Sequence, residues 1–254
     1  MLDDFQLIVH KLPEDVPYIN IYPLGDVHLG SKECDLDLLH QWMKMVYDDP
    51  YGYVVILGDL MNMGLRNSKT NVYEEVLNPR QQKELCYEIL KPIANRILAG
   101  CSGNHEYRNV KEVGTNPLYD VFCRLQLEDV YRENACFLKI SLGKRKKDRQ
   151  VAYGVTLTHG SSVNKDLKWI YSVDNCDLFI NGHTHDSNHK PVGKIVLDMQ
   201  NEMVRTAPVH DVVVTPFQAY GGYAIRNKYL PNHLGQFQKI TLFGDTKRIG
   251  YTFS

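Results

Sequence analysis

The chain has 254 residues, of which 43% are hydrophobic and 23% are charged, and its formal net charge at pH 7 is −1. These fractions are ordinary for a globular protein with a sizeable core, and the near-zero charge excludes bulk electrostatic attraction to nucleic acid. The sequence has no apolar run long enough to cross a bilayer, and its acidic start over residues 1–10 lacks the layout of a secretory signal.

The six cysteines are scattered along the chain without the close spacing of a zinc knuckle. We interpret them as reduced thiols, which predicts a cytoplasmic protein and not a disulfide scaffold. No internal repeat, low-complexity run or linker divides the sequence, so residues 1–254 are expected to form a single domain.

Strands and helices are predicted to alternate over the first half of the chain. The helix that follows the second strand carries apolar residues at helical spacing, and Asp35 or Asp37 is expected near its start. The predicted elements are strands near 5–10 and at 18–24, a helix over 34–47, a strand at 53–57, a helix over 73–90 interrupted near Pro79, a helical stretch over 92–98 overlapping a short strand at 96–101, and a helix over 118–125.

From Ala135 onward the sequence is rich in strand-like runs. The predicted elements are a hairpin of strands 135–142 and 151–157 around a basic turn at 143–149, a helix over 166–173, a strand at 176–180, and further strands at 194–198, 202–206, 211–215 and 236–243. Together the two halves predict an α/β protein in which two packed sheets have helices outside them.

Polar residues beside a glycine follow five of the strand-like runs. The clearest case is Ile21–Gly30, where a buried strand is expected to end in a tight turn. Ligands of open α/β sheets bind beyond the carboxyl ends of the strands, so we expect the five turns to meet. The five turns carry Asp26 and His28, Asp59, Asn104 and His105, His159, and His183 and His185.

The residue types in these turns predict a metal site. Imidazoles and carboxylates without cysteine suit borderline divalent metals, and we expect manganese first, with iron, zinc or nickel as alternatives. Seven candidate ligands are too many for one ion, but they fit two ions about 3.5–4 Å apart that share a carboxylate. Asn104 offers an amide oxygen without adding charge. His105 stands beside a ligand, which leaves it free for proton transfer.

The ordered set resembles the calcineurin-like metallophosphoesterase family, whose motifs are Asp-x-His, Gly-Asp, Gly-Asn-His-[Asp/Glu], His and Gly-His-x-His. In this chain the motifs read Asp26-Val27-His28, Gly58-Asp59, Gly103-Asn104-His105-Glu106, His159 and Gly182-His183-Thr184-His185. The complete set is specific, although each motif alone is not. The resemblance implies a four-layer α-β-β-α sandwich of two mixed β-sheets flanked by helices.

The resemblance also implies a role for each residue and a hydrolytic reaction, in which two divalent ions acidify a shared water and the hydroxide attacks phosphorus. The implied roles are first-metal ligation by Asp26, His28 and His185, second-metal ligation by Asn104, His159 and His183, bridging by Asp59, and contact with the phosphate or protonation of the leaving oxygen by His105.

Four further residues have two interpretations each, and a fifth, Glu106, has one. Arg66, Arg108 and Asn164 lie in loops just after motifs, where they would hold the substrate phosphate or be solvated. Asn62 would orient His105 or serve an ordinary turn. Glu106 is interpreted as structural support for the site. The histidines outside the turns are interpreted as surface or structural residues, and they are His10, His40, His189, His210 and His233.

The leading function prediction is a metal-dependent phosphoesterase that acts on phosphodiesters, in a nucleic acid or a nucleotide. The alternative is a phosphomonoesterase. A non-catalytic interaction scaffold on the same fold would have lost ligands, and none is missing. The segment Gly58–Gly64 lacks the arginine of the family's protein-phosphatase motif, Gly-Asp-x-Val-Asp-Arg-Gly, and Glu106 departs from the Gly-Asn-His-Asp of its repair nucleases.

Overall fold

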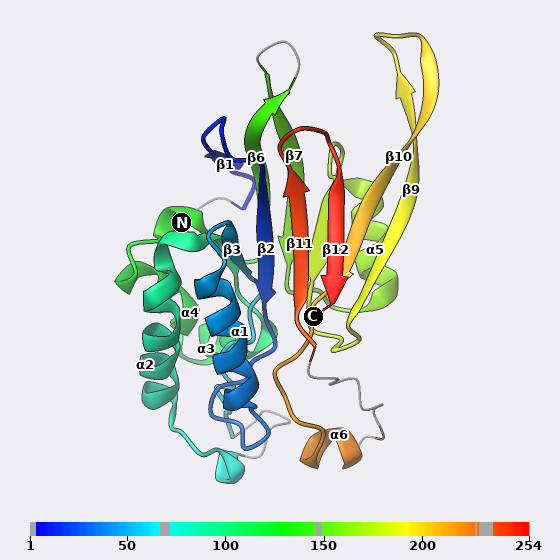
Figure 1. Cartoon of the computed structure of the whole chain (residues 1–254). Coiled ribbons are helices and arrows are strands. Elements are labelled where there is room, and N and C mark those ends of the chain that lie inside the picture. The colour runs from blue at the N-terminus through cyan, green and yellow to red at the C-terminus, as the bar shows by residue number, and fades with distance from the viewer. Residues whose placement is uncertain (1–3, 67–71, 146–148, 227, 229–235, 254) are drawn as a thin grey trace.

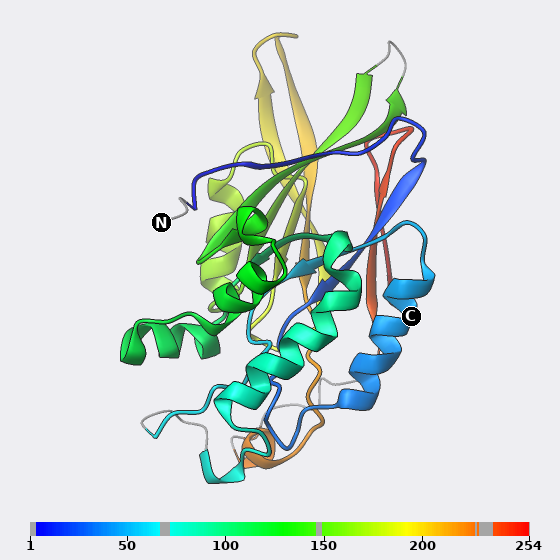
Figure 2. The ribbon, with the colours of Figure 1, turned by 90° about the vertical axis from the view of Figure 1, so that its left-hand side faces the viewer.

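The computed structural model describes residues 4–66, 72–145, 149–226, 228 and 236–253. In this part of the chain, two mixed six-stranded sheets pack face to face, and helices cover both outer faces (Figures 1 and 2). The predicted α-β-β-α sandwich is therefore confirmed. None of the helices in the described ranges is both long and apolar enough to span a bilayer.

One sheet carries the first three motif turns. Its order is β12 (Ile249–Phe253), β11 (Gln238–Phe243), β2 (Tyr18–Leu24), β3 (Gly52–Ile56), β4 (Ile97–Cys101) and β5 (Tyr131–Arg132). The neighbours β2, β3 and β4 run parallel, with Leu24 beside Ile56 and Ile56 beside Gly100. Their carboxyl ends therefore lie at one edge of the sheet, at the bottom of Figure 1.

The other sheet carries the last two motif turns. Its order is β1 (Ile8–Lys11), β6 (Ala135–Arg145), β7 (Arg149–Thr158), β8 (Leu178–Asn181), β10 (Met203–Val213) and β9 (Asn188–Asp198). The strands β7 and β8 are parallel neighbours, so His159 and His183 follow strand ends on the same edge. The predicted hairpin of β6 and β7 is confirmed, although residues 146–148 of its turn lie outside the described residues.

Three helices cover the outer face of the first sheet. They are α1 (Leu36–Asp48), α2 (Pro79–Leu90) and α4 (Pro117–Arg124), and they bury large apolar side chains such as Trp42 and Phe122 against β2 and β3. Asp35, one of the two aspartates expected near the start of α1, caps the helix by accepting a hydrogen bond from the backbone N–H of Leu38 at 2.9 Å.

An inner core and an outer helix complete the sandwich. Between the sheets, side chains such as Ile21, Val55, Leu157 and Ile180 form a buried apolar core. On the far side, α5 (Val163–Ser172) packs Ile170 against the outer face of the second sheet. The apolar cluster between α5 and the second sheet is small, because α5 is the main helix on that face in the described part of the chain (Figure 1).

Several element predictions were wrong in extent. The helix predicted over 73–90 is a short 3-10 turn, Val72–Glu74, followed by α2, and Pro79 begins that helix because Asn78 and Gln81 form a capping box around it. The stretch predicted helical over 92–98 is the 3-10 helix Lys91–Arg96. A third 3-10 helix covers Glu128–Val130, and α6 covers Gly222–Arg226.

Three elements differ more strongly from prediction. The helix α3 (Asn104–Val113) begins at the Gly-Asn-His-Glu motif, where no helix was predicted. The two strands predicted at 202–206 and 211–215 are one strand, β10, which continues through Pro208 because it pairs there with only one neighbour, β9. The strand β12 was not predicted.

Candidate metal centre

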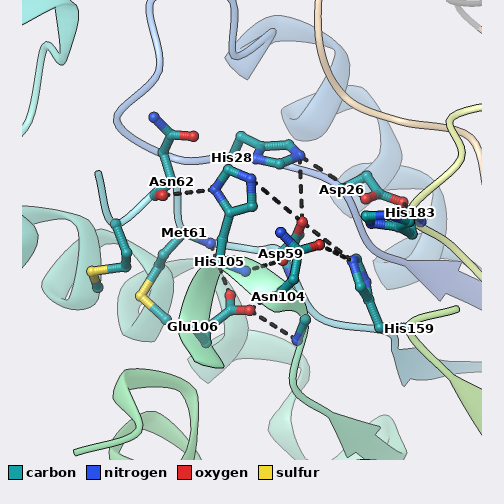
Figure 3. Close-up of polar contacts among 12 residues, drawn as sticks. Asp26, His28, Asp59, Met61, Asn62, Asn104, His105, Glu106, His159 and His183 are labelled. Carbon is teal, nitrogen blue, oxygen red and sulfur yellow. Dashed lines mark hydrogen bonds and ion pairs between the residues drawn. The ribbon is translucent and has the colours of Figure 1, made fainter. Parts of the chain in front are cut away.

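The five motif turns meet at the shared edge of the two sheets (Figure 3). Three groups of side chains bring possible ligand atoms within 4.8 Å of one another. They are Asp26, His28 and His185; His28, Asp59 and His105; and Asp59, His159 and His183. The sequence-predicted residues Asp26, His28, Asp59, His105, His159, His183 and His185 therefore converge, and Asn104 joins them through a contact of its Oδ1 with His159 Nε2 at 3.0 Å.

The backbone of these turns has an unusual conformation. Five of the converging residues have positive φ angles, which L-residues rarely adopt. These angles are 51° at Asp26, 54° at His28, 50° at Asp59, 69° at His183 and 55° at His185. Such strain costs of order 1–3 kcal/mol per residue and is concentrated at functional sites, where it fixes the direction of the side chain.

Asp59 occupies the middle of the cluster. Its Oδ2 lies 3.2 Å from His159 Nε2, 3.7 Å from His105 Nε2 and 3.9 Å from His28 Nε2, and its side chain is 2% exposed. Its Oδ1 accepts a hydrogen bond from the backbone N–H of His105 at 2.8 Å. One carboxylate therefore faces histidines from both sheets, which is the placement that a bridging ligand requires.

Asp26 organises the other side of the cluster. Its Oδ2 accepts a hydrogen bond from the backbone N–H of His183 at 2.9 Å, and its Oδ1 lies 3.2 Å from His185 Nε2 and 4.0 Å from His28 Nε2. Because Asp26 belongs to one sheet and His183 to the other, this bond joins the two sheets directly at the site.

Two histidines show that the cluster fits a metal. Both ring nitrogens of His28 are buried and have no hydrogen-bond partner among the described residues, although the ring lies between two carboxylates. His159 Nδ1 lies 2.7 Å from the carbonyl oxygen of Leu57, which only accepts, so Nδ1 carries the proton. Nε2 of His159, which faces Asp59 and Asn104, is therefore the nitrogen that would bind a metal once it has lost its proton.

Two glycines allow the turns to approach each other. A Cβ at Gly58 would lie 2.0 Å from the backbone nitrogen of Gly103, and a Cβ at Gly103 would lie 2.1 Å from Asp59 Oδ1. Gly58 also has a φ of +76°. The glycines of the Gly-Asp and Gly-Asn-His-Glu motifs are therefore required by contact between the two turns.

Glu106 supports these same turns, as the sequence predicted. Its side chain is fully buried and accepts hydrogen bonds from the backbone N–H groups of Asp59 at 2.8 Å, Gly103 at 3.0 Å and Met61 at 3.2 Å (Figure 3). Burial, together with the charge of Asp59, raises the pKa of Glu106 to about 7.

His105 is held by the loop that contains Asn62, in agreement with one of the two interpretations of Asn62 from the sequence. Its Nδ1 lies 2.7 Å from the backbone carbonyl oxygen of Asn62, so Asn62 orients His105 through its main chain. The side chain of Asn62 donates to Glu75 Oε1 at 3.1 Å, and Glu75 Oε2 accepts from the fully buried Gln82 at 2.6 Å. In the sequence, Asn78 and Pro79 signal the start of α2, the helix that carries Gln82. That signal was the available indication that the segment around Glu75 is held in place.

Burial and neighbouring charges set the protonation of the histidines in the cluster. Burial opposes the charged form of His159, but the adjacent Asp59 carboxylate outweighs it and raises the pKa of His159 to about 10. Burial lowers the pKa of His28 well below its usual value, with His105 adding to the effect. A cation bound here must therefore displace a proton from His159, whereas His28 is already neutral.

The other predicted residues lie outside this cluster. The charge of Arg108 acts on His105 and contributes, after burial, to lowering the pKa of its imidazole, so Arg108 lies near the site. Arg66 and Asn164 are exposed. His10 contacts the Leu98 carbonyl oxygen at 2.7 Å. Of the other histidines, His189 and His210 are paired at 2.9 Å and His40 is exposed, whereas His233 lies outside the described residues.

The profile of the calcineurin-like phosphoesterase family matches residues 19–187. No protein of curated function matches the chain in sequence. Among solved structures, the chain is similar to a metallophosphoesterase from Sphaerobacter thermophilus, with 12% identity, coverage of 93% of this chain and 88% of the other, and a TM-score of 0.46. It is also similar to Vps29 in complex with zinc from Entamoeba histolytica, with 14% identity, coverage of 92% and 99%, and a TM-score of 0.43.

A further similar structure is the calcineurin-like phosphoesterase YfkN from Bacillus subtilis, with 11% identity, coverage of 94% and 90%, and a TM-score of 0.39. The family match covers most of the chain and includes every motif turn described above. The protein belongs to the calcineurin-like phosphoesterase family, a class of metal-dependent hydrolases, and carries a candidate binuclear metal site.

Proposed function

We propose that this enzyme hydrolyses phosphodiesters with two divalent cations, manganese first, bound at the candidate metal centre. The observation that carries the proposal is the convergence of two carboxylates with histidines from both sheets around Asp59. The proposed ligands are Asp26, His28 and His185 for one cation, Asn104, His159 and His183 for the other, and Asp59 for both.

The proposed division of work follows from the donor atoms. Divalent cations bound in this cluster supply Lewis acidity, which lowers the pKa of water and offsets negative charge on a phosphate ester. Asp59 keeps the two binding positions close together, because its carboxylate already faces histidines on either side. The left-handed turns at Asp26 and His183 hold the ligands in position before a substrate arrives.

His105 is the proposed acid for the leaving oxygen. Its Nδ1 proton is committed to the Asn62 carbonyl oxygen, so Nε2 is the nitrogen available to the substrate. Donation from Nε2 requires the imidazolium form. Burial lowers the pKa of His105, and the Asp59 carboxylate, 3.7 Å away, opposes that lowering. Arg108, whose charge reaches His105, is proposed to bind the phosphate, and Arg66 and Asn164 are proposed as outer contacts.

The preference for diesters is supported by access to the centre. The side chain of His185 is 34% exposed, so the cluster opens to solvent on that side. A substrate with groups on both sides of the phosphate would meet an open edge there.

All six cysteines are free thiols, and we infer a cytoplasmic location from them.

The test compares turnover of bis(p-nitrophenyl) phosphate and p-nitrophenyl phosphate by the wild-type protein with Mn²⁺, Zn²⁺, Fe²⁺ and Ni²⁺. We expect a higher kcat/KM for the diester and the strongest activation by Mn²⁺. Chelation should abolish activity, and added Mn²⁺ should restore it. A clear preference for the monoester would contradict the diester proposal, and the same assay on nucleic acids and cyclic nucleotides would then narrow the natural substrate.

A further inference from the structure

A long two-stranded ribbon projects from the sandwich. The strands β9 and β10 pair over eleven residues each, from Asn188 with Val213 to Asp198 with Met203. Only His210–Val213 of β10 also pairs with β8, so within the described residues the outer part of the ribbon has no third strand. Figures 1 and 2 show it rising past the ends of the other strands. Isolated two-stranded ribbons are marginally stable in water.

One face of this ribbon is apolar and exposed. Ile195 is 77% exposed, Leu197 is 67% exposed, and Val204, directly opposite Leu197, is 66% exposed. Because strand side chains alternate between faces, these three share a face with Val212, which is buried between the two sheets. The exposed apolar face therefore continues the inner face of the second sheet beyond the point where the first sheet covers it.

The outer edge of β9 is also available. This strand is the last of its sheet, and no described strand pairs with its other edge. A long unpaired edge is a template for another strand. The side chains on the ribbon face opposite the apolar one include Lys194, Val196 and Asp198.

We propose that β9 pairs antiparallel with β9 of a second copy of this chain, about a two-fold axis at Val196. In this register Lys194 of each copy lies opposite Asp198 of the other, and Ile195 lies opposite Leu197. The sequence Lys-x-Val-x-Asp is therefore complementary to its own reverse, which identifies the partner as a second copy.

Other registers are less favourable. A shift by one residue, to an axis at Ile195 or Leu197, places Lys194 or Asp198 opposite Val196 and loses the Lys194–Asp198 pairs. An axis at Lys194 would place two lysines opposite each other, and an axis at Asp198 would do the same for two aspartates. Lys194 Nζ donates to the Val173 carbonyl oxygen at 2.9 Å, but an ammonium group has three donors and keeps two for Asp198. Asp198 lies 3.8 Å from Arg205 and remains on the same face as Lys194.

Pairing would convert two marginal ribbons into one four-stranded sheet. The exposed Ile195, Leu197 and Val204 of both copies would then form a single apolar cluster across the new strand pair. The ribbon points away from the edge that holds the metal centre (Figure 1). Dimerisation at β9 would therefore leave both metal centres open, and it does not depend on the proposed catalytic activity.

The test uses reciprocal charge reversal, measured by sedimentation velocity from low to high micromolar concentration. We expect wild-type protein to dimerise, and Lys194→Asp and Asp198→Lys each to raise the dissociation constant by roughly tenfold or more. An equimolar mixture of the two variants should form heterodimers, because each restores the charge that the other lacks. The double variant should dimerise like wild type. The matched control reverses the charges of the exposed pair Lys44 and Asp48 on α1, which should leave the dissociation constant unchanged.

A second experiment reads the register directly. In a Cys123→Ser background, which removes the exposed thiol, Val196→Cys should crosslink between copies under mild oxidation. Lys194→Cys should not, because its two copies are four positions apart along the strand, roughly 13 Å. Circular dichroism confirms that each variant is folded. A wild-type monomer at every concentration would overturn the proposal and leave the ribbon to a different partner. A dimer that withstands charge reversal without crosslinking at position 196 would overturn it equally.

Discussion

Replacing Glu106 with glutamine should destabilise the protein by an amount that its contacts define. Glu106 Oε2 accepts from the N–H groups of Asp59 and Gly103, while Oε1 accepts from Met61. A glutamine with its carbonyl oxygen at the Oε2 position keeps two of these bonds and turns an amide donor toward the N–H of Met61. The N–H of Met61 and the glutamine amide that faces it are then both unsatisfied, which together costs at least about 2 kcal/mol. Glu106→Ala leaves all three unsatisfied, at a cost of at least about 3 kcal/mol.

The assay is urea unfolding of the chelated protein at pH 8, above the Glu106 pKa of about 7, so that the wild-type carboxylate is ionised. The matched control is Glu88→Gln, at an exposed position of α2, which should change the free energy of unfolding by no more than about 0.5 kcal/mol. Because Glu106 holds the turns that carry Asp59 and Asn104, Glu106→Gln should also weaken Mn²⁺ binding in calorimetry.

Two results would refute this reasoning. A Glu106→Gln protein as stable as the Glu88→Gln control would mean that the three backbone bonds contribute nothing net. Equal losses of unfolding free energy in Glu106→Gln and Glu106→Ala would mean that the glutamine does not keep the two hydrogen bonds expected to survive.

Three further predictions concern the centre itself. His105→Ala should lower kcat by about 10²–10⁴-fold while metal content by mass spectrometry stays unchanged; loss of metal would make His105 a ligand. Asp59→Asn should remove both ions, and loss of one ion alone would argue against a bridge. Gly103→Ala places a Cβ 2.1 Å from Asp59 Oδ1 and should cost about 1–3 kcal/mol of unfolding free energy or more. Gly193→Ala is the control, because a Cβ at that position has no atom within 4 Å. Similar losses of unfolding free energy in the two variants would refute the crowding at Gly103.

The local sequence predicted elements well where one physical signal dominated. The strand β2 spans Tyr18–Leu24 as expected, because its apolar residues are buried on both faces. The helix α1 begins after Asp35, one of the two aspartates expected near its start. The helix α3 was missed because Asn104 and His105 were assessed for chemistry alone, although Glu106, three residues after Gly103, is a helix-start signal.

The sequence by itself also predicted the candidate ligands and their order along the chain, since Asp, Asn and His beside glycine at strand ends are chemical signals that need no coordinates. Only the tertiary structure decided that residues as distant as Asp26 and His183 are joined by a 2.9 Å hydrogen bond across two sheets. It alone decided that β10 continues through Pro208, and that one face of the ribbon stays uncovered. These features depend on which strands become neighbours, and contacts between distant segments leave no periodic signal in either segment alone.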